Sequence, residues 1–146
     1  MWISITEADV LTVLSGPELE AYRHAAKASG QSDPVSPTLA QVVALVRGYV
    51  GAWGRNRLGE AGTIPEKLLA PALDLIALRL PQRVRVNPNE VRKLNAQAAL
   101  RLFEQVANGQ FDIEEPVTPD AESTDSGRPT ITARVRQFGA SREEGV

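Results

Sequence analysis

The sequence lacks several of the side chains on which enzyme chemistry usually depends. Its 146 residues include no cysteine, a single histidine and only 5% aromatic residues. The absence of cysteine excludes disulfides, thiolate nucleophiles and zinc–thiolate sites, and it suits a reducing cytoplasm. We expect the one histidine, His24, to be exposed or half-packed. The sequence therefore predicts that the protein is not an enzyme, and the rival enzyme hypothesis needs a pocket that positions His24 or Asp74.

Long apolar runs are also missing. No window approaches the ~20 consecutive apolar residues that a membrane span needs. Residues 1–7 lack the basic region followed by an apolar stretch that marks a signal peptide. We expect a soluble chain that is not exported and does not meet a membrane. The net charge of −2 does not mark a nucleic-acid or membrane-surface protein.

Two short patterns imitate ligand-binding motifs but lack their essential residues. Residues 54–59 copy the outer glycines of a phosphate loop, but Glu60 and Ala61 follow where Lys and Ser or Thr are needed. The acidic residues around position 114 offer oxygen ligands in a Pro-rich setting without preorganised geometry, which favours a solvated acidic run over a cation site. We expect neither a cofactor nor a metal.

What the sequence does contain divides at residue 109. Residues 1–109 carry 12 basic and 10 acidic side chains, a net of +2, and read as a compact helical body. Residues 110–146 carry 4 basic and 8 acidic side chains, a net of −4, and begin as a linker rich in Pro, Ser, Thr, Asp and Glu. The division predicts a helical body, 1–109, followed by an acidic linker and an extended arm, 110–146.

Apolar periodicity and capping signals predict an all-α bundle of four or five helices, with no strand before residue 110. The expected helices span about 7–14, 18–29, 36–53, 63–80 and 87–108. Helix starts are expected at capping boxes or at caps followed by proline: Thr6 with Asp9, Ser36-Pro37, Thr63 with Glu66, and Asn87-Pro88. Helix ends are expected at Gly16-Pro17, Gly30, Pro81 and Asn108-Gly109.

Side-chain patterns also predict how these helices pack. Residues 68–80 are apolar on most sides and belong at the centre, where Asp74 needs a cationic partner from Arg47 or Arg101. Small residues four apart, Ala44, Gly48 and Ala52, form a ridge that we expect another helix of the same chain to approach closely. The last helix is expected to bury one face: Val91, Leu94, Ala98, Leu102 and Val106.

Basic side chains gather in two places. Arg55 and Arg57 share one loop, and a second group falls within 15 residues: Arg79, Arg83, Arg85, Arg92 and Lys93. Without interleaved aromatic residues this pattern favours a solvated helix connection. Contact with DNA phosphates or with the acidic linker of a neighbouring copy are the alternatives. The corresponding alternative function is a small DNA-binding accessory protein that uses residues 79–93.

The arm carries an alternating run at residues 130–138. Ile131, Ala133 and Val135 share one strand face, and Thr132, Arg134 and Arg136 share the other. A single strand with one apolar face needs a partner, because it has no neighbouring strand of its own. We therefore predict that the arm docks on another chain through Ile131, Val135 and Phe138, steered by Arg134 and Arg136.

Several stretches, taken in order, resemble the head-completion or head–tail connector (adaptor) proteins of tailed bacteriophages, in particular the virion protein of Mu-like phages. The resemblance covers nearly the whole chain and lies in six segments: Ile5–Val10, Val46–Val50, Ile64–Leu69, Ala72–Ala77, Leu102–Gly109 and Arg134–Phe138. Family members place an aromatic before a Leu-Pro pair after the third helix. Here a longer glycine-rich loop, 54–62, follows Trp53 instead.

The resemblance implies a structural virion subunit. Such a subunit forms a ring, of twelve copies, between the portal protein and a tail-proximal connector or tail terminator protein. The ring completes the head, provides the tail attachment site and lets double-stranded DNA pass without sequence readout. On this reading the protein is assembled in the bacterial host cytoplasm and lies at the head–tail interface of the virion. The candidate subunit or DNA-channel contacts are basic: Arg55, Arg57, Arg83, Arg85, Arg92 and Lys93.

Overall fold

A computed structural model describes residues 1–117 of the chain. In this part the fold is mostly helical, which confirms the all-α prediction. The helices in chain order are α1 (Glu7–Val10), α2 (Gly16–Ala28), α3 (Val35–Ala52), the short 3₁₀ turn η1 (Glu66–Leu68), α4 (Leu69–Arg83) and α5 (Glu90–Ala107). Two very short strands accompany them: β1 (Trp2–Ile3) and β2 (Ile64–Pro65).

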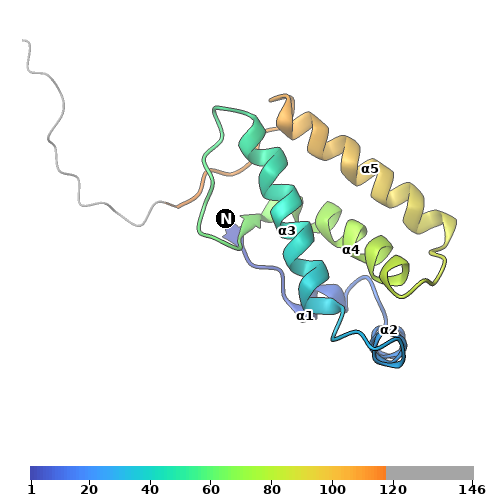
Figure 1. Cartoon of the computed structure of the whole chain (residues 1–146). Coiled ribbons are helices and arrows are strands. Elements are labelled where there is room, and N and C mark those ends of the chain that lie inside the picture. The colour runs from blue at the N-terminus through green and yellow to red at the C-terminus, as the bar shows by residue number, and fades with distance from the viewer. Residues whose placement is uncertain (118–146) are drawn as a thin grey trace, which may run out of the picture.

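The three long helices α3, α4 and α5 pack on one another and enclose the core, while α1 lies against α4 (Figure 1). In Figure 1, α2 lies at the edge of the body and is seen nearly along its axis. The core includes large side chains that are fully buried: Leu14, Leu19, Leu68, Leu75, Ile76, Leu80 and Phe103. Burying each such side chain stabilises the fold by about 1.5–3 kcal/mol.

Helix α4 is the central element, as its continuous apolar sequence predicts. Eight of its 15 residues are buried, so it is apolar on most sides and contacts neighbours in several directions. Pro81 does not end it, contrary to the sequence prediction, because the helix continues to Arg83. The chain turns only at Arg85, whose positive φ of 60° lets the amide of Val86 donate to the Pro81 carbonyl. A proline in the last turn removes a single helical hydrogen bond, which the buried ring offsets by packing.

Polar caps begin α1 and α2. Thr6 and Asp9 form the predicted capping box, in which each side chain bonds the other residue's backbone amide. Ser15 caps α2 by accepting from the Glu18 amide, so Gly16-Pro17 starts this helix rather than ending the previous one. A proline in the first helical turn has no helical hydrogen bond to lose.

Three further helix starts differ from the prediction. Helix α3 begins one residue before the expected Ser36 cap, and the Asp33 carboxylate accepts from its first amide at 3.0 Å. Asn89, two residues after the expected Asn87, caps α5 by accepting from the Arg92 amide. Thr63 does not start a helix at all, because the chain is extended at β2 before η1 begins.

The strand pair β1–β2 was not predicted. Trp2 pairs with Pro65 and Ile3 with Ile64 in an antiparallel arrangement. Each strand is two residues long, too short for alternation to show in the sequence. Residues before a proline favour extended backbone, and this places Ile64 in a strand rather than in a capping box.

Two helix faces are oriented differently from the prediction. Helix α5 buries Ala96, Ala99, Phe103 and Val106, whereas Val91 and Leu94 are 64% and 62% exposed. The small side chains of Ala96 and Ala99 let α5 approach the body closely, which decides between two apolar stripes of similar strength. On α3 the whole ridge of small residues 44, 48 and 52 is exposed, so it makes no helix contact within the described chain.

Candidate interaction surfaces

The loop after α3 is held by Arg47 and Trp2. The Arg47 guanidinium donates to three loop carbonyls, those of Gly59, Glu60 and Thr63, at 2.7–3.1 Å. It also lies 5.7 Å from the centroid of the Trp2 ring, a cation–π contact. The ring also packs on Gly59, where an added Cβ would lie 2.8 Å from the indole. The Arg47 guanidinium is therefore bound within its own body. It does not form the predicted pair with Asp74.

Residues 110–117 lie along the body rather than leaving it at Gly109. Phe111 and Ile113 pack against the core. The Trp2 indole N–H donates to the Glu114 carbonyl at 2.8 Å, and the Glu114 carboxylate accepts from the Glu66 amide at 3.1 Å. The predicted linker therefore begins as a packed segment, because two apolar side chains among its acids find burial against the helices.

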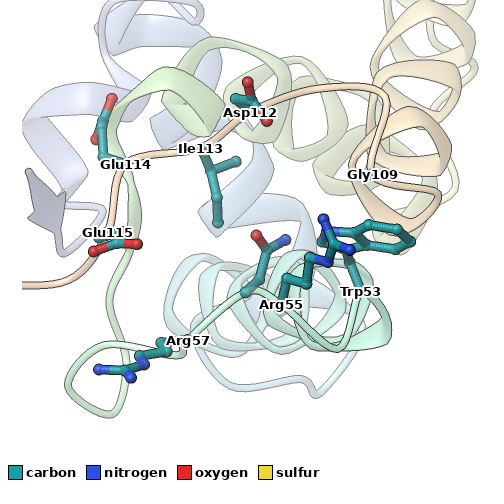
Figure 2. Close-up of a pocket in the computed structure, with 9 residues that line it drawn as sticks. Trp53, Arg55, Arg57, Gly109, Asp112, Ile113, Glu114 and Glu115 are labelled. Atoms are coloured by element: carbon teal, nitrogen blue, oxygen red, sulfur yellow. The ribbon is translucent and has the colours of Figure 1, made fainter.

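A hollow of about 360 Å³ separates this segment from the loop after α3. Figure 2 shows Arg55 and Arg57 on the loop side and three acids, Asp112, Glu114 and Glu115, on the other. Arg55 lies 5.8 Å from the Trp53 ring centroid. Within residues 1–117 neither arginine forms an ion pair. The hollow thus carries charges of both signs and does not favour an anionic ligand.

Arg92 is tied into the body. Its guanidinium bonds the Glu18 carboxylate, with one Nη2–Oε2 distance of 2.9 Å, and also reaches the Tyr22 hydroxyl at 3.3 Å. The hydrogen bond from Arg92 lowers the pKa of Glu18 despite partial burial of the carboxyl, and Glu18 in turn raises the pKa of Arg92. Burial and the neighbouring carboxylate raise the pKa of Tyr22. The three groups join the start of α5 to the start of α2.

The second basic group of the sequence is divided in space. Lys93 pairs with Glu90 one turn earlier on α5. Arg83 and Arg85 line a separate hollow beside Ser29 and Gln31, just beyond α2. The 13 residues of α2 span about 20 Å, which separates these two arginines from the Glu18–Arg92 pair at the other end of that helix. The structure therefore does not bring the five charges into one patch.

Asp74 lines a hollow of about 260 Å³ between α4 and the start of α5. The other residues around it are Val13, Ala77, Asn89, Val91, Arg92 and Asn95. Burial raises the pKa of the Asp74 carboxyl. No hydrogen bond or ion pair to this carboxylate is found within the described chain, so the predicted pairing with Arg47 or Arg101 is wrong. Arg101 is exposed on α5.

The candidate arm residues lie outside the described residues: Ile131, Arg134, Val135, Arg136 and Phe138. Their docking stays a prediction.

His24 is exposed on α2, as expected. In residues 1–117 no group of three or more acidic, histidine or cysteine side chains is placed to hold a metal ion. None of the helices in this part combines the length and apolar character needed to cross a membrane.

Sequence reasoning missed the structural roles of Trp2, Arg47 and Glu18. Each acts through contacts at least 12 residues away in the chain, which leave no local pattern. The one available signal was Arg47, a lone charge in an otherwise uncharged 18-residue helix.

No protein-family model, no curated protein and no solved structure matches the chain.

Proposed function

We propose that the chain is an adaptor (connector) subunit of a tailed-phage virion. Copies form a ring between the portal and the tail, complete the head, offer the tail attachment site and surround the DNA channel. The ordered resemblance of six segments over nearly the whole chain supports this proposal. The mostly helical body, whose described part offers no group of side chains placed to hold a metal ion, supports a structural part rather than a catalytic one.

The exposed ridge on α3 is the observation that carries the proposal. A glycine inside a helix costs about 1 kcal/mol relative to alanine. Gly48 has no positive φ, and a Cβ added there meets nothing within 4 Å, so packing within the described chain gives no reason for it. Ala44 and Ala52 extend the same uncharged, exposed stripe. A close approach by another subunit accounts for small residues at these positions.

A second unpartnered face lies on α5. Val91 and Leu94 are mostly exposed and one turn apart. This face and the α3 ridge lie on two different helices of the body, which pack on each other and on α4. A subunit with two different interaction surfaces associates head to tail. Such contacts close into a ring when the rotation between copies permits.

The arm adds a contact that repeats once per subunit. Docking of Ile131, Val135 and Phe138 on another chain buries apolar area worth a few kcal/mol at ~25 cal/mol per Å². Each contribution is modest, but all copies in a ring make it together.

The DNA-binding alternative receives less support from the geometry. Arg92 and Lys93 are engaged by Glu18 and Glu90, and Arg83 and Arg85 line a different hollow. Salt titration separates the two functions. A DNA-binding accessory protein loses affinity steeply with rising salt, whereas the connector subunit is expected to bind free DNA little at any salt.

The α3 ridge provides the test. Gly48→Lys places a long charged side chain in the ridge, and Ala21→Lys makes a similar change on the exposed side of α2. Both variants should fold, as circular dichroism checks. Only Gly48→Lys should stop ring formation and head–tail joining, measured by the mass of the assembled species and by electron microscopy of particles. Normal joining with Gly48→Lys, or particles that do not contain the chain, would contradict the proposal.

A second test removes the arm. Chains cut after residue 128 should retain the helical body but give particles that fail to join tails. Normal assembly by the shortened chain would show that the arm has no such role.

A further inference from the structure

The hollow around Asp74 has the chemistry of a docking site. Its walls are apolar at Val13, Ala77 and Val91, and a carboxylate lies among them. Val91 is 64% exposed, and Leu94 continues the same apolar face one turn along α5. An apolar stripe of α5 therefore adjoins the hollow.

The charge balance around this hollow favours a positively charged occupant. Arg92 is the basic residue that lines it, and its guanidinium is already bound to Glu18. The Glu18–Arg92 pair is neutral as a unit, so Asp74 contributes an uncompensated negative charge among the described residues. Asn95 adds a side-chain amide oxygen that accepts a hydrogen bond from a guanidinium.

The arm of this protein has the matching chemistry. Residues 130–138 alternate apolar side chains with Arg134 and Arg136. An arginine lays its aliphatic stem along an apolar wall while its guanidinium reaches a carboxylate. Asp74 then gains the hydrogen-bonded partner that a partly buried carboxylate needs.

The chain is long enough for this contact. The described chain ends at Val117, beside Trp2 and Gly59. Ile131 lies 14 positions after Val117, and a chain of that length spans up to about 46 Å when extended. The hollow lies at the start of α5, a helix about 27 Å long. A segment of this length is long enough to bring residues 130–138 to the hollow of a neighbouring copy.

We propose that the Asp74 hollow of one subunit receives residues 130–138 of a neighbouring copy, with Arg134 or Arg136 on the Asp74 carboxylate and Ile131 and Val135 against Val91. The inference rests on the proposed function and specifies which surface takes the arm. It also assigns Asp74 and Val91 to a subunit contact.

Because the chain has no cysteine, engineered disulfides report this contact directly. A full-length chain carrying Val91→Cys and Val135→Cys is assembled and oxidised. Head-to-tail docking should link copy to copy and give a ladder of covalent multimers on a denaturing, non-reducing gel. A chain with Val135→Cys and Ala28→Cys, at an exposed position on α2 away from the hollow, serves as the matched control.

Three outcomes decide the inference. A ladder that exceeds the control, and that adding Asp74→Asn weakens about fivefold, as expected for loss of ~1 kcal/mol, supports it. Monomers with an internal disulfide, or a yield equal to the control, overturn it. If the arm contact is overturned while particles still join tails, the connector function stands and the arm docks elsewhere. If the cysteine-free chain also forms no ring, the connector function itself has failed.

Discussion

The guanidinium of Arg92 holds the carboxylate of Glu18, a residue 74 positions earlier in the chain. Side chains of both residues are less than one-third exposed, so water screens the pair less than a fully exposed one. The contact fixes the start of α2 against the start of α5. The tertiary arrangement thus depends on a polar contact as well as on the apolar core.

Replacing Arg92 tests the strength of this contact. Arg92→Gln should lower the free energy of unfolding by about 1–2 kcal/mol, because a charge-assisted pair and its bond to Tyr22 are lost. Lys93→Gln removes a neighbouring surface pair with Glu90 and should change stability by less than about 0.5 kcal/mol. Urea denaturation measures both. Equal effects of the two substitutions would contradict the assigned role of Arg92.

The same pair predicts a pH dependence. Arg92 lowers the pKa of Glu18 in the folded state below its ordinary value of about 4.5. The stabilising contribution is therefore fully present above pH ~4.5 and is lost as pH falls through the lowered pKa. The difference in unfolding free energy between wild type and Arg92→Gln should shrink as the pH falls below 4.5. A stability difference that stays constant down to pH 2 would contradict this prediction.

Asp74 is expected to weaken the isolated subunit. Burial raises its pKa in the folded state, so its ionised form disfavours folding at neutral pH and the penalty disappears once acid protonates it. Asp74→Asn should raise the unfolding free energy of dilute protein by about 0.5–1 kcal/mol at pH 7, and by less at pH 4. Asp112→Asn, at an exposed position, is the control and should change little. A destabilised Asp74→Asn subunit at pH 7 would mean that the carboxylate has a partner within its own chain.

The buried face of α5 can be tested with two truncations on the same helix. Phe103 is fully buried and stacks on Tyr49 with ring centroids 5.8 Å apart. Phe103→Ala should cost about 3–5 kcal/mol. Leu94→Ala, at a position 62% exposed, should cost less than about 0.5 kcal/mol. If the two costs were reversed, α5 would face the core with the stripe that its sequence first suggests.

Two glycines should respond in opposite directions to alanine. Gly109 has φ of +74°, and an added Cβ would lie 2.5 Å from the Trp53 ring. Gly109→Ala should therefore destabilise the fold by more than about 1 kcal/mol. Gly48→Ala adds a methyl group in open space inside a helix and should stabilise the isolated subunit by about 0.5–1 kcal/mol. Thermal unfolding of both variants, each compared with wild type, gives the answer.

The helices of this fold could be predicted from the sequence because their signals are local. The Thr6–Asp9 capping box depends on two residues three apart, and the apolar run of α4 is continuous. The end of α5 at Asn108-Gly109 likewise needs only the positive φ that glycine adopts freely.

Orientation of the helices could not be predicted in the same way. Helix α5 has two apolar stripes, and the choice between them depends on how closely α4 can approach Ala96 and Ala99. The strand at Ile64 pairs with residues 2 and 3, about 60 positions away, and no local pattern reveals that pairing. Arg47 binds loop carbonyls instead of Asp74, a set of long-range contacts that no helical spacing reveals.

The seating of residues 109–114 against the body has an optical consequence. The chain has two tryptophans, and both contact this stretch: Trp53 packs on Gly109, and Trp2 hydrogen-bonds the Glu114 carbonyl. Intrinsic fluorescence therefore follows the attachment of one short segment rather than the average environment of the protein. An emission maximum that moves when a partner is added would signal that this segment has been displaced, without any introduced label.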